Sequence, residues 1–510
     1  MDSLLRTPPA VLRPDTEKYR GPVLAPGPVV PLFLNRPDSG IDTRRKGHVD
    51  FAGRRIHFMG AGGIGVSALM ELAAARGAIV SGCDCCEGGQ VPHLRARNMQ
   101  IDAAHSPNHI CDCDELVHTA AVNADHAEVA RARNENKIVR SRMAMLGQLA
   151  RGTRAVCVTG AHGKTSTTWM IARILIAANR DPSVLVGGVV PGLNGNVRIG
   201  QGDEFVIETD ESDNKLHEIV PSIPVLTNID NDHLENYGSL EKLQNAIARF
   251  MSSTDSSDPL AALIGCGDDA RVRHILSVAS VFCRRPVLSY GFDAHNSLVG
   301  LNLRSENGGL SWRFDALGPF GVWQDMLLPM PGRHNVLNAL AAIGTAWQLG
   351  VAESVIRGAL AGIERVGRRF EIKLNGPVRV IDDYGHHPTE IALTLKAARA
   401  STRKRLGVLF QPHRYTRTAA LMGQFAACFA EADAVFLLPI YAAGETAIDG
   451  VTHESLAEAL REAGHSHVTT FGKRDDAVAA LVKWSRRGDT IVTQGAGDVT
   501  RASHELVSRL

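Results

Sequence analysis

A glycine-rich loop with the sequence GAHGKTS, at residues 160–166, carries the residues best suited to phosphate chemistry. It follows a short apolar run at residues 156–158 and precedes a helical pattern. In such a loop the glycines let backbone N–H groups approach phosphate oxygens, Lys164 reaches the outer phosphates and the Thr165 hydroxyl can bind Mg²⁺. A glycine-rich turn that only caps a structural helix is the alternative, and Val158 replaces one glycine of the full Walker pattern. We expect a nucleoside triphosphate site formed by Gly160, Ala161, His162, Gly163, Lys164, Thr165 and Ser166.

A metal-bound phosphate also needs a carboxylate on a neighbouring strand. Residues 205–207 predict a buried strand that leads into the acidic segment ETDESD at residues 208–213. Open parallel sheets bind ligands at the carboxyl ends of their strands, so Glu208 is the predicted Mg²⁺ ligand. A solvated acidic turn is the alternative, because runs of charge usually face water. His233, which follows a predicted strand at residues 225–229, is a second candidate metal ligand, although a histidine there also fits a polar surface.

A second glycine-rich turn, GAGGIG at residues 60–65, lies near the N-terminus between an apolar strand pattern and a helix pattern. A G-x-G-x-x-G turn of this kind places a pyrophosphate on the helix N-terminus. Asp84 follows the next predicted strand, where a ribose-binding acid belongs. These residues predict a dinucleotide-like ligand, and both NAD and a nucleotide sugar meet that description.

Two polar segments near the C-terminus each follow a predicted strand. They are IDDYGHHP at residues 381–388 and FQPHRYTR at residues 410–417. Because both lie at strand carboxyl ends, His386, Arg414 and Arg417 are expected to converge on one crevice. Arginines there suit a carboxylate or a phosphate through paired hydrogen bonds. A basic pair of loops held by neighbouring acids is the alternative.

The elements that must position these residues alternate between strands and helices. The pattern starts three times, with apolar runs before Ala/Leu-rich helical stretches at residues 55–59 and 67–75, 155–158 and 165–177, and 378–381 and 388–400. This alternation predicts an α/β fold with parallel sheets and three units. We expect a Pro-rich, poorly ordered tail at residues 1–50, followed by domains at residues 51–152, 153–366 and 367–510.

Composition excludes several function classes. The chain of 510 residues has 55 basic and 54 acidic residues, so no overall field favours nucleic acid or anionic lipid. No apolar run reaches the roughly 18 residues of a membrane span, and residues 1–11 lack the apolar stretch of a secretory signal. We therefore expect a cytoplasmic protein with no nucleic-acid partner and no membrane insertion.

The chain has nine cysteines, five of them in the clusters Cys83/Cys85/Cys86 and Cys111/Cys113. Their odd total argues against a disulfide framework, and neither cluster has the C-x₂-C spacing of common structural zinc sites. Reduced structural thiols are the interpretation we favour, with a zinc site as the alternative.

Seven segments occur in an order that resembles the Mur ligase family: GAHGKTS, ETDESD, TNIDNDH, GRHNVLNA, GRRFE, DDYGHHPTE and FQPHRYTRT. The resemblance extends from about residue 54 to the C-terminus, and HHPTE with FQPHRYTRT favours the alanine-adding branch. It implies an N-terminal Rossmann-like domain for the UDP-substrate, a central P-loop ATPase α/β domain and a C-terminal Rossmann-like domain for the amino acid. The implied reaction uses ATP and Mg²⁺ to join L-alanine to the lactyl carboxylate of UDP-N-acetylmuramate through an acyl phosphate, in peptidoglycan precursor synthesis. The implied assembly is a monomer or a homodimer.

The resemblance also implies a role for individual positions. Catalytic roles fall on Lys164, Glu208, His233, Arg369 and Asp383, and metal contacts on Thr165, Glu208 and His233. Asn335 and Asn338 join the phosphate loop in the ATP site. UDP-substrate contacts fall on Gly62, Gly63, Ile64, Gly65, Asp84 and His105, and contacts with the amino acid on His386, Arg414 and Arg417.

Three other functions stay open at this point. A ligase that attaches recycled murein tripeptide is the nearest one. A nonenzymatic paralogue that senses the UDP-sugar is suggested by Ala161, which replaces the threonine usual in the family. A nicotinamide dehydrogenase built on residues 60–65 leaves the GKT loop unexplained.

Overall fold

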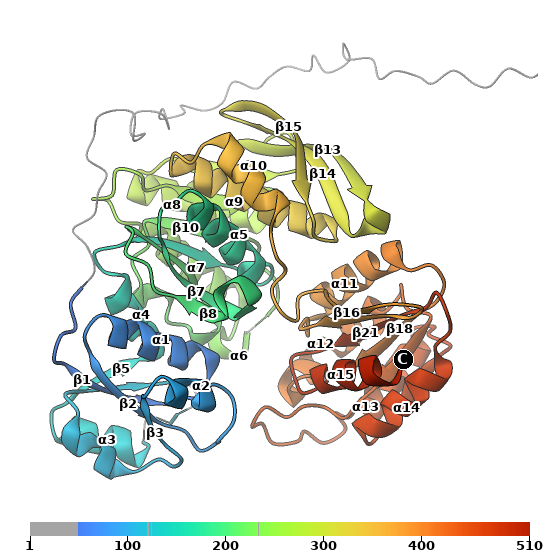
Figure 1. Ribbon diagram of the computed structural model, residues 1–510, viewed down its shortest axis with the longest axis horizontal. Helices are drawn as coiled ribbons and strands as arrows, with labels where there is room; N and C mark the ends of the chain where they lie inside the picture. Colours follow the sequence, from blue (N-terminus) through green and yellow to red (C-terminus); the bar gives the residue numbers. More distant parts are fainter. Residues whose placement is uncertain (1–48, 120–121, 124, 233) are drawn as a thin grey trace, which may run out of the picture.

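Three β-sheets follow one another along the chain, and each forms the centre of its own α/β lobe (Figure 1). The computed structural model describes residues 49–510 except 120, 121, 124 and 233. The predicted tail, apart from its last two residues, and the predicted ligand His233 therefore lie outside the described residues.

The first sheet has five parallel strands in the order β3-β2-β1-β4-β5. Its strands are β1 (Arg55–Met59), β2 (Ile79–Cys83), β3 (Gln100–Asp102), β4 (Glu115–His118) and β5 (Ile138–Ser141). Its helices are α1 (Ile64–Ala75), α2 (Val91–Ala96), α3 (Ala127–Asn134), α4 (Arg142–Ala150) and the 3₁₀ turn η2 (Pro107–Asp112). Helices α1 and α3 cover opposite faces, and α1 faces the central lobe (Figure 1). The apolar side chains of α1 and α4 belong to a core that continues into the central lobe, so the two lobes pack as neighbours.

The second sheet has ten strands in the order β15-β14-β13-β12-β11-β10-β6-β9-β7-β8. Those that flank the phosphate loop are β6 (Arg154–Thr159), β9 (Glu204–Glu208) and β10 (Ile223–Leu226). The others are β7 (Ser183–Val190), β8 (Gly195–Arg198), β11 (Leu263–Cys266), β12 (Val287–Gly291), β13 (Leu298–Glu306), β14 (Ser311–Gly318) and β15 (Gly321–Leu328). The helices are α5 (Lys164–Ala177), α6 (Leu234–Tyr237), α7 (Leu240–Ser252), α8 (Ala270–Cys283), α9 (Arg333–Gln348) and α10 (Glu353–Ala361). β6 lies between β9 and β10 and is parallel to both, so the ends of these strands meet at one edge.

The third sheet has six strands in the order β16-β17-β21-β18-β19-β20. They are β16 (Glu371–Asn375), β17 (Arg379–Asp383), β18 (Leu406–Phe410), β19 (Ala434–Leu437), β20 (Val468–Thr470) and β21 (Thr490–Gln494). The helices are α11 (Pro388–Ser401), α12 (Tyr415–Cys428), α13 (His453–Glu462), α14 (Arg474–Trp484) and α15 (Thr500–Arg509). Helix α11 begins just after β17, and a capping box formed by His387 and Glu390 closes its N-terminus.

The expectation of purely parallel sheets is wrong for part of the chain. Strands β13, β14 and β15 form an antiparallel meander, and β7/β8 and β16/β17 are antiparallel pairs. The turns that join the meander, at residues 307–310 and 319–320, are too short to hold a crossover helix, so the chain must reverse direction there. Among the described residues, no helix combines the length and apolar character needed to cross a membrane.

Candidate active site

The phosphate loop connects the end of β6 to the start of α5. Gly163 precedes α5 with φ of +81°, a backbone conformation that favours glycine, and an added Cβ would lie 2.5 Å from Asn338 Oδ1. Asn338 in turn donates to Asn335 Oδ1 at 3.0 Å, so the two predicted asparagines of α9 form one wall of the loop. The shape of the loop is thus set by contacts within the protein.

Lys164 lies at the first position of α5 and is folded back over the loop. Its Nζ donates to Gly160 O at 2.7 Å and forms an ion pair with Glu211 Oε1 at 2.8 Å. Burial alone would lower the pKa of Lys164, but the carboxylates of Glu211 and Asp210 outweigh it and raise the pKa. A lysine held charged at this point can neutralise phosphate oxygens.

Thr165 and Glu208 form the second polar pair of the loop. Thr165 Oγ1 donates to Glu208 Oε1 at 2.9 Å, and Gly187 N donates to Glu208 Oε2 at 2.6 Å. A hydroxyl and a carboxylate are hard oxygen ligands of the kind that Mg²⁺ prefers, so Thr165 and Glu208 fit the ion. The solvated-turn alternative does not describe this segment, because Glu211 is only 2% exposed and Glu208 is half-buried.

Arg369 and Asp383 come to the loop from the C-terminal lobe. Arg369 Nη2 lies 3.4 Å from Thr165 Oγ1. Asp383 is buried and accepts hydrogen bonds from the backbone N–H groups of Phe370 at 2.8 Å and Gly385 at 2.9 Å. Burial raises the pKa of Asp383, although Arg369 and these hydrogen bonds act in the other direction. Asp383 thus fixes the backbone that follows Arg369.

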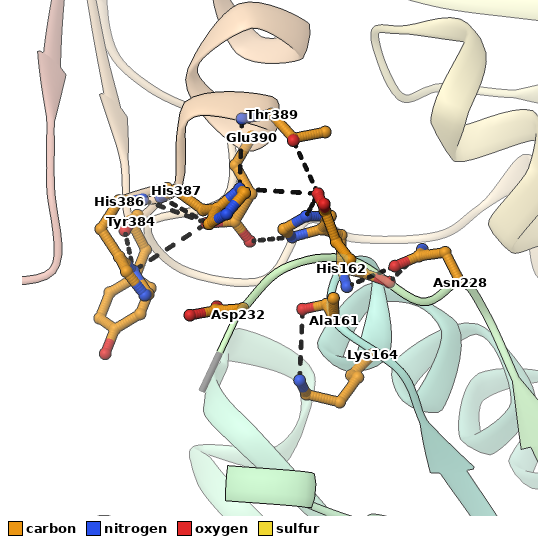
Figure 2. Close-up of polar contacts among 12 residues, drawn as sticks. Ala161, His162, Lys164, Asn228, Asp232, Tyr384, His386, His387, Thr389 and Glu390 are labelled. Carbon is orange, nitrogen blue, oxygen red and sulfur yellow. Dashed lines mark hydrogen bonds and ion pairs between the residues drawn. The ribbon is translucent and has the colours of Figure 1, made fainter. Parts of the chain in front are cut away.

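His162 joins the loop to α11 of the C-terminal lobe. Figure 2 shows its side chain facing Thr389 and Glu390 across the domain boundary. His162 Nε2 lies 2.8 Å from Asp230 Oδ2, which also accepts from the Thr389 hydroxyl at 2.7 Å. His162 Nδ1 lies 3.4 Å from Glu390 Oε1. Burial alone would lower the pKa of His162, but the bonds to Asp230 and Glu390 raise it to about 9. The imidazole is therefore a cation that ties two lobes together at neutral pH.

Two adjoining cavities, of about 80 and 850 Å³, open beside this network. Both are lined by His162, Gly163, His334, Asn338 and Leu393, so they form one cleft. The smaller one also contains Thr165, Ser166, Asn335, Arg369 and Asp383. The larger one has an aromatic wall of Tyr290, Phe292 and Trp312, and the Arg333 guanidinium lies 4.2 Å from the Phe292 ring centre. A cleft with one polar end and one aromatic end suits a nucleoside polyphosphate, whose phosphates are polar and whose base is aromatic.

The three residues predicted to hold an amino acid all lie near His413. The ring centres of His386 and His413 are 5.6 Å apart, and burial followed by the charges of Arg417 and Arg414 lowers the pKa of His413. His386 and Arg417 lie on the side of the C-terminal lobe that faces Asp232, and Arg417 Nη2 donates to Asp232 Oδ1 at 2.9 Å. Burial, followed by the charge of Arg417, lowers the pKa of His386 to about 3, so this imidazole is neutral. Arg414 Nε lies 4.0 Å from Glu445 Oε1, and the Arg414 side chain is 37% exposed. The alternative of loops held by neighbouring acids therefore describes part of this region.

The predicted UDP-substrate residues lie at the edge of the first sheet. Gly62, Gly63, Ile64 and Gly65 form the turn into α1, and Gly62 N donates to Asp84 Oδ2 at 2.8 Å. His105 lies nearby, with its Nδ1 2.9 Å from Cys83 Sγ. The turn and the acid are thus brought together as expected, whereas His105 contacts a thiol that the sequence analysis did not connect with it.

Several residues of the cleft were not assigned from the sequence. Asp230, Thr389 and Glu390 lie in the TNIDNDH and DDYGHHPTE segments, which marked the region but not the contact between them. The aromatic wall carries no local motif, because Tyr290 and Phe292, at the end of β12, line the cavity together with Trp312 of β14.

Three protein-family models match this chain in succession. One described as "Mur ligase family, catalytic domain" matches residues 55–154, one described as "Mur ligase middle domain" matches residues 158–346, and one described as "Mur ligase, glutamate ligase domain" matches residues 368–497. The fold and the site are those of a three-domain α/β protein with a phosphate loop at a domain boundary. The chain belongs to the Mur ligase family. The predicted family and fold class are thereby confirmed.

Individual relatives cover nearly the whole chain. A protein of Chelativorans sp. named UDP-N-acetylmuramate--L-alanine ligase is 38% identical over 465 residues, which are 89% of this chain and 98% of that protein. A protein of Myxococcus xanthus with the same name is 38% identical over 484 residues, 94% of this chain and 98% of that protein. A crystal structure of UDP-N-acetylmuramate-alanine ligase from Thermotoga maritima superimposes with a TM-score of 0.74 at 29% identity, covering 89% of this chain and 98% of that one.

Proposed function

We propose that this protein joins L-alanine to the lactyl carboxylate of UDP-N-acetylmuramate in an ATP- and Mg²⁺-dependent reaction. The observation that carries the proposal is the meeting of Thr165, Glu208 and Arg369 at one point between two lobes. Relatives 38% identical over most of their length bear the name of this activity.

In the first step, a carboxylate oxygen of the UDP-substrate attacks the γ-phosphorus of ATP and forms an acyl phosphate. The bond between the γ-phosphorus and the β–γ bridging oxygen breaks, and ADP leaves with that oxygen and the electron pair. Lys164 and Arg369 lie where they can neutralise charge on the transferring phosphoryl group, which is the main catalytic need in such a step. Mg²⁺ held by Thr165 and Glu208 would supply further positive charge to the phosphate oxygens. Closure of the C-terminal lobe over the loop would exclude water from the acyl phosphate.

In the second step, the amine of L-alanine attacks the acyl carbon, the amide bond forms, and inorganic phosphate leaves while the amine loses a proton. Arg417 lies at the lobe boundary and is buried to 7% exposure, so it is placed to hold the alanine carboxylate. Holding the carboxylate would orient the amine and convert a collision into a step within one complex.

The test is a product analysis with purified full-length protein. UDP-N-acetylmuramate, ATP and Mg²⁺ are supplied with L-alanine, glycine, L-serine or the murein tripeptide in separate reactions, while ADP release and product mass are measured. ADP release that needs both the UDP-substrate and L-alanine, with a product heavier by one alanyl residue, is expected. A product formed only with the tripeptide would assign the recycling activity instead, and no ADP release with any acceptor would favour a UDP-sugar sensor.

A further inference from the structure

A second group of chemically active side chains lies in the N-terminal lobe, away from the phosphate loop. We call it the His–Cys–Glu cluster and define it as His57 of β1, Cys83 of β2, His109 of η2 and Glu128 of α3. One ligand atom from each of these residues lies within 4.8 Å of the others. Helix α3 covers one face of the first sheet (Figure 1), and Cys83 packs there with Val129 and Ala132 of α3.

The distances inside the cluster are close to those around a single small cation. His57 Nε2 lies 3.3 Å from Cys83 Sγ, and Cys83 Sγ lies 3.6 Å from Glu128 Oε2. Ligands at zinc's usual bond lengths of about 2.0–2.3 Å sit roughly 3.3–3.8 Å apart in a tetrahedron. His109 Nδ1 and Glu128 Oε1 are closer, at 2.7 Å, as a hydrogen bond requires. A small rotation of one side chain would convert that pair into two ligands.

In each imidazole of the cluster, the ring nitrogen that points away from the other cluster residues lies close to an oxygen atom. His57 Nδ1 lies 2.8 Å from Ser81 Oγ, which leaves Nε2 directed at Cys83. His109 Nε2 lies 3.3 Å from Asp102 Oδ2, which leaves Nδ1 directed at Glu128. Metal-binding histidines typically have this support, because it fixes the tautomer and the ring orientation.

Burial and charge also fit a divalent cation. His57 is 1% exposed, and Cys83 and Glu128 are 0% exposed. One thiolate, one carboxylate and two neutral imidazoles around a divalent cation leave no net charge in the buried site.

We propose that the His–Cys–Glu cluster binds one Zn²⁺ ion in a closed, tetrahedral site. The thiolate and imidazole ligands favour zinc over Mg²⁺, which takes oxygen ligands. With four protein ligands the ion has no open position, so its role is structural: it links η2 and α3 to β1 and β2. Cys83 directly precedes Asp84, so the ion also fixes the strand end that carries the predicted ribose-binding acid.

The proposed site differs from the zinc alternative suggested by the cysteine clusters. Cys85, Cys86 and Cys111 are exposed free thiols, and Cys113 is a buried one outside the cluster. Only Cys83 contributes a sulfur. His105 Nδ1, 2.9 Å from Cys83 Sγ, is placed to donate a hydrogen bond to the thiolate from outside the ligand set.

The test measures metal binding directly and does not depend on activity. Full-length, tag-free protein is purified, its zinc is measured by elemental analysis, and the metal-free protein is titrated with Co²⁺ in the absence of Mg²⁺ and nucleotide. The elemental analysis should find one equivalent of zinc. The Co²⁺ titration should give a thiolate-to-cobalt charge-transfer band and the visible bands of tetrahedral cobalt. For each ion bound, the Cys83 thiol should release about one proton. The other His/Asp groupings in the described residues contain no thiol, so they cannot produce the charge-transfer band.

Two serine variants form a matched pair. Cys83→Ser should lose the charge-transfer band and the rise in melting temperature that Zn²⁺ gives the wild type, whereas Cys85→Ser should retain both. If Cys83→Ser does not fold, two other measurements show whether the cluster binds the metal. They are the wild-type titration and the titration of His109→Gln, which should bind Co²⁺ at least 10-fold more weakly. A wild-type protein with no zinc and no thiolate band, or a band that persists in Cys83→Ser, would overturn the proposal.

Discussion

The Arg369 guanidinium lies 3.4 Å from the Thr165 hydroxyl, although the two residues are 204 positions apart and belong to different lobes. Burial alone would lower the pKa of Arg369, but Glu390, Asp383 and Glu208 outweigh it and raise the pKa. A permanent positive charge from the C-terminal lobe therefore meets the phosphate loop of the central lobe. This contact makes the lobe boundary, rather than the loop alone, the expected place of phosphoryl transfer.

Replacing Arg369 should impair catalysis more than binding. In Arg369→Ala the loop keeps Lys164, so ATP still binds, but one charge is missing from the transition state. We expect kcat to fall by about 10²–10³-fold, the usual effect of losing one such donor. Initial rates of ADP release measure it. Arg304→Ala, which removes an exposed arginine paired with Asp325, is the control and should keep the wild-type rate. An unchanged kcat in Arg369→Ala would contradict the role.

Lys164→Ala should abolish ADP release while binding of the UDP-substrate stays measurable by calorimetry. The substitution also leaves Glu211, which is 2% exposed, without its lysine, so the melting temperature should fall. Adding Glu211→Gln should recover part of the stability because it removes the buried charge, but it should restore no activity. Wild-type turnover in either variant would rule out Lys164 as the phosphate-binding lysine.

The His162 cation should make the lobe contact sensitive to alkaline pH. Its pKa is raised from 6.5 to about 9, so its stabilising contribution is fully present below pH 6.5 and is lost as pH rises through about 9. Asp230, Glu390, His387 and His334 are the ionisable groups around it. We expect His162→Gln to melt below the wild type at neutral pH and the two curves to converge above pH 9. A constant difference in melting temperature across this range would contradict the assignment.

Local sequence features predicted the individual elements well. Predicted helices at residues 165–177 and 388–400 correspond to α5 and α11, because a glycine or proline marks each start. The strand predicted at residues 225–229 starts too late and runs too far, since β10 spans Ile223–Leu226. There the side chains of Thr227 and Asn228 turn to His162 O at 2.7 and 2.9 Å, and the backbone leaves the sheet.

Contacts between lobes could not be predicted in the same way. Glycine, lysine and threonine in the loop identify phosphate chemistry because their spacing alone sets the geometry. The Thr389–Asp230 contact, in contrast, joins residues 159 positions apart on two lobes, and no local spacing encodes it. The backbone at Arg414 was not predicted either: this residue precedes α12 with φ of +69°, a left-handed conformation that is uncommon for residues other than glycine.

The two arginines predicted to hold the amino acid should differ in importance. Arg417 is buried and lies 2.9 Å from Asp232, whereas the Arg414 side chain is 37% exposed. Arg417→Lys keeps the charge but loses the paired hydrogen bonds, so KM for L-alanine should rise about 10-fold or more while KM for ATP stays within about twofold. Arg414→Lys is the matched variant and should show a smaller rise. Equal rises in KM for L-alanine would show that Arg414 moves to the substrate.

Gly163→Ala should damage the phosphate loop through both conformation and space. The residue has φ of +81°, where a side chain costs about 1–2 kcal/mol, and the new Cβ would lie 2.5 Å from Asn338 Oδ1. We expect a lower melting temperature and at least 10-fold weaker ATP binding by calorimetry, because Asn338 and the loop must separate. Gly423→Ala, at a helical position in α12 with nothing within 4 Å of an added Cβ, should instead gain about 0.5–1 kcal/mol of stability. Adding Asn338→Ala to Gly163→Ala frees the space but not the backbone, so recovery should be partial. Full recovery would mean that the contact with Asn338, rather than the left-handed backbone, requires glycine at this position.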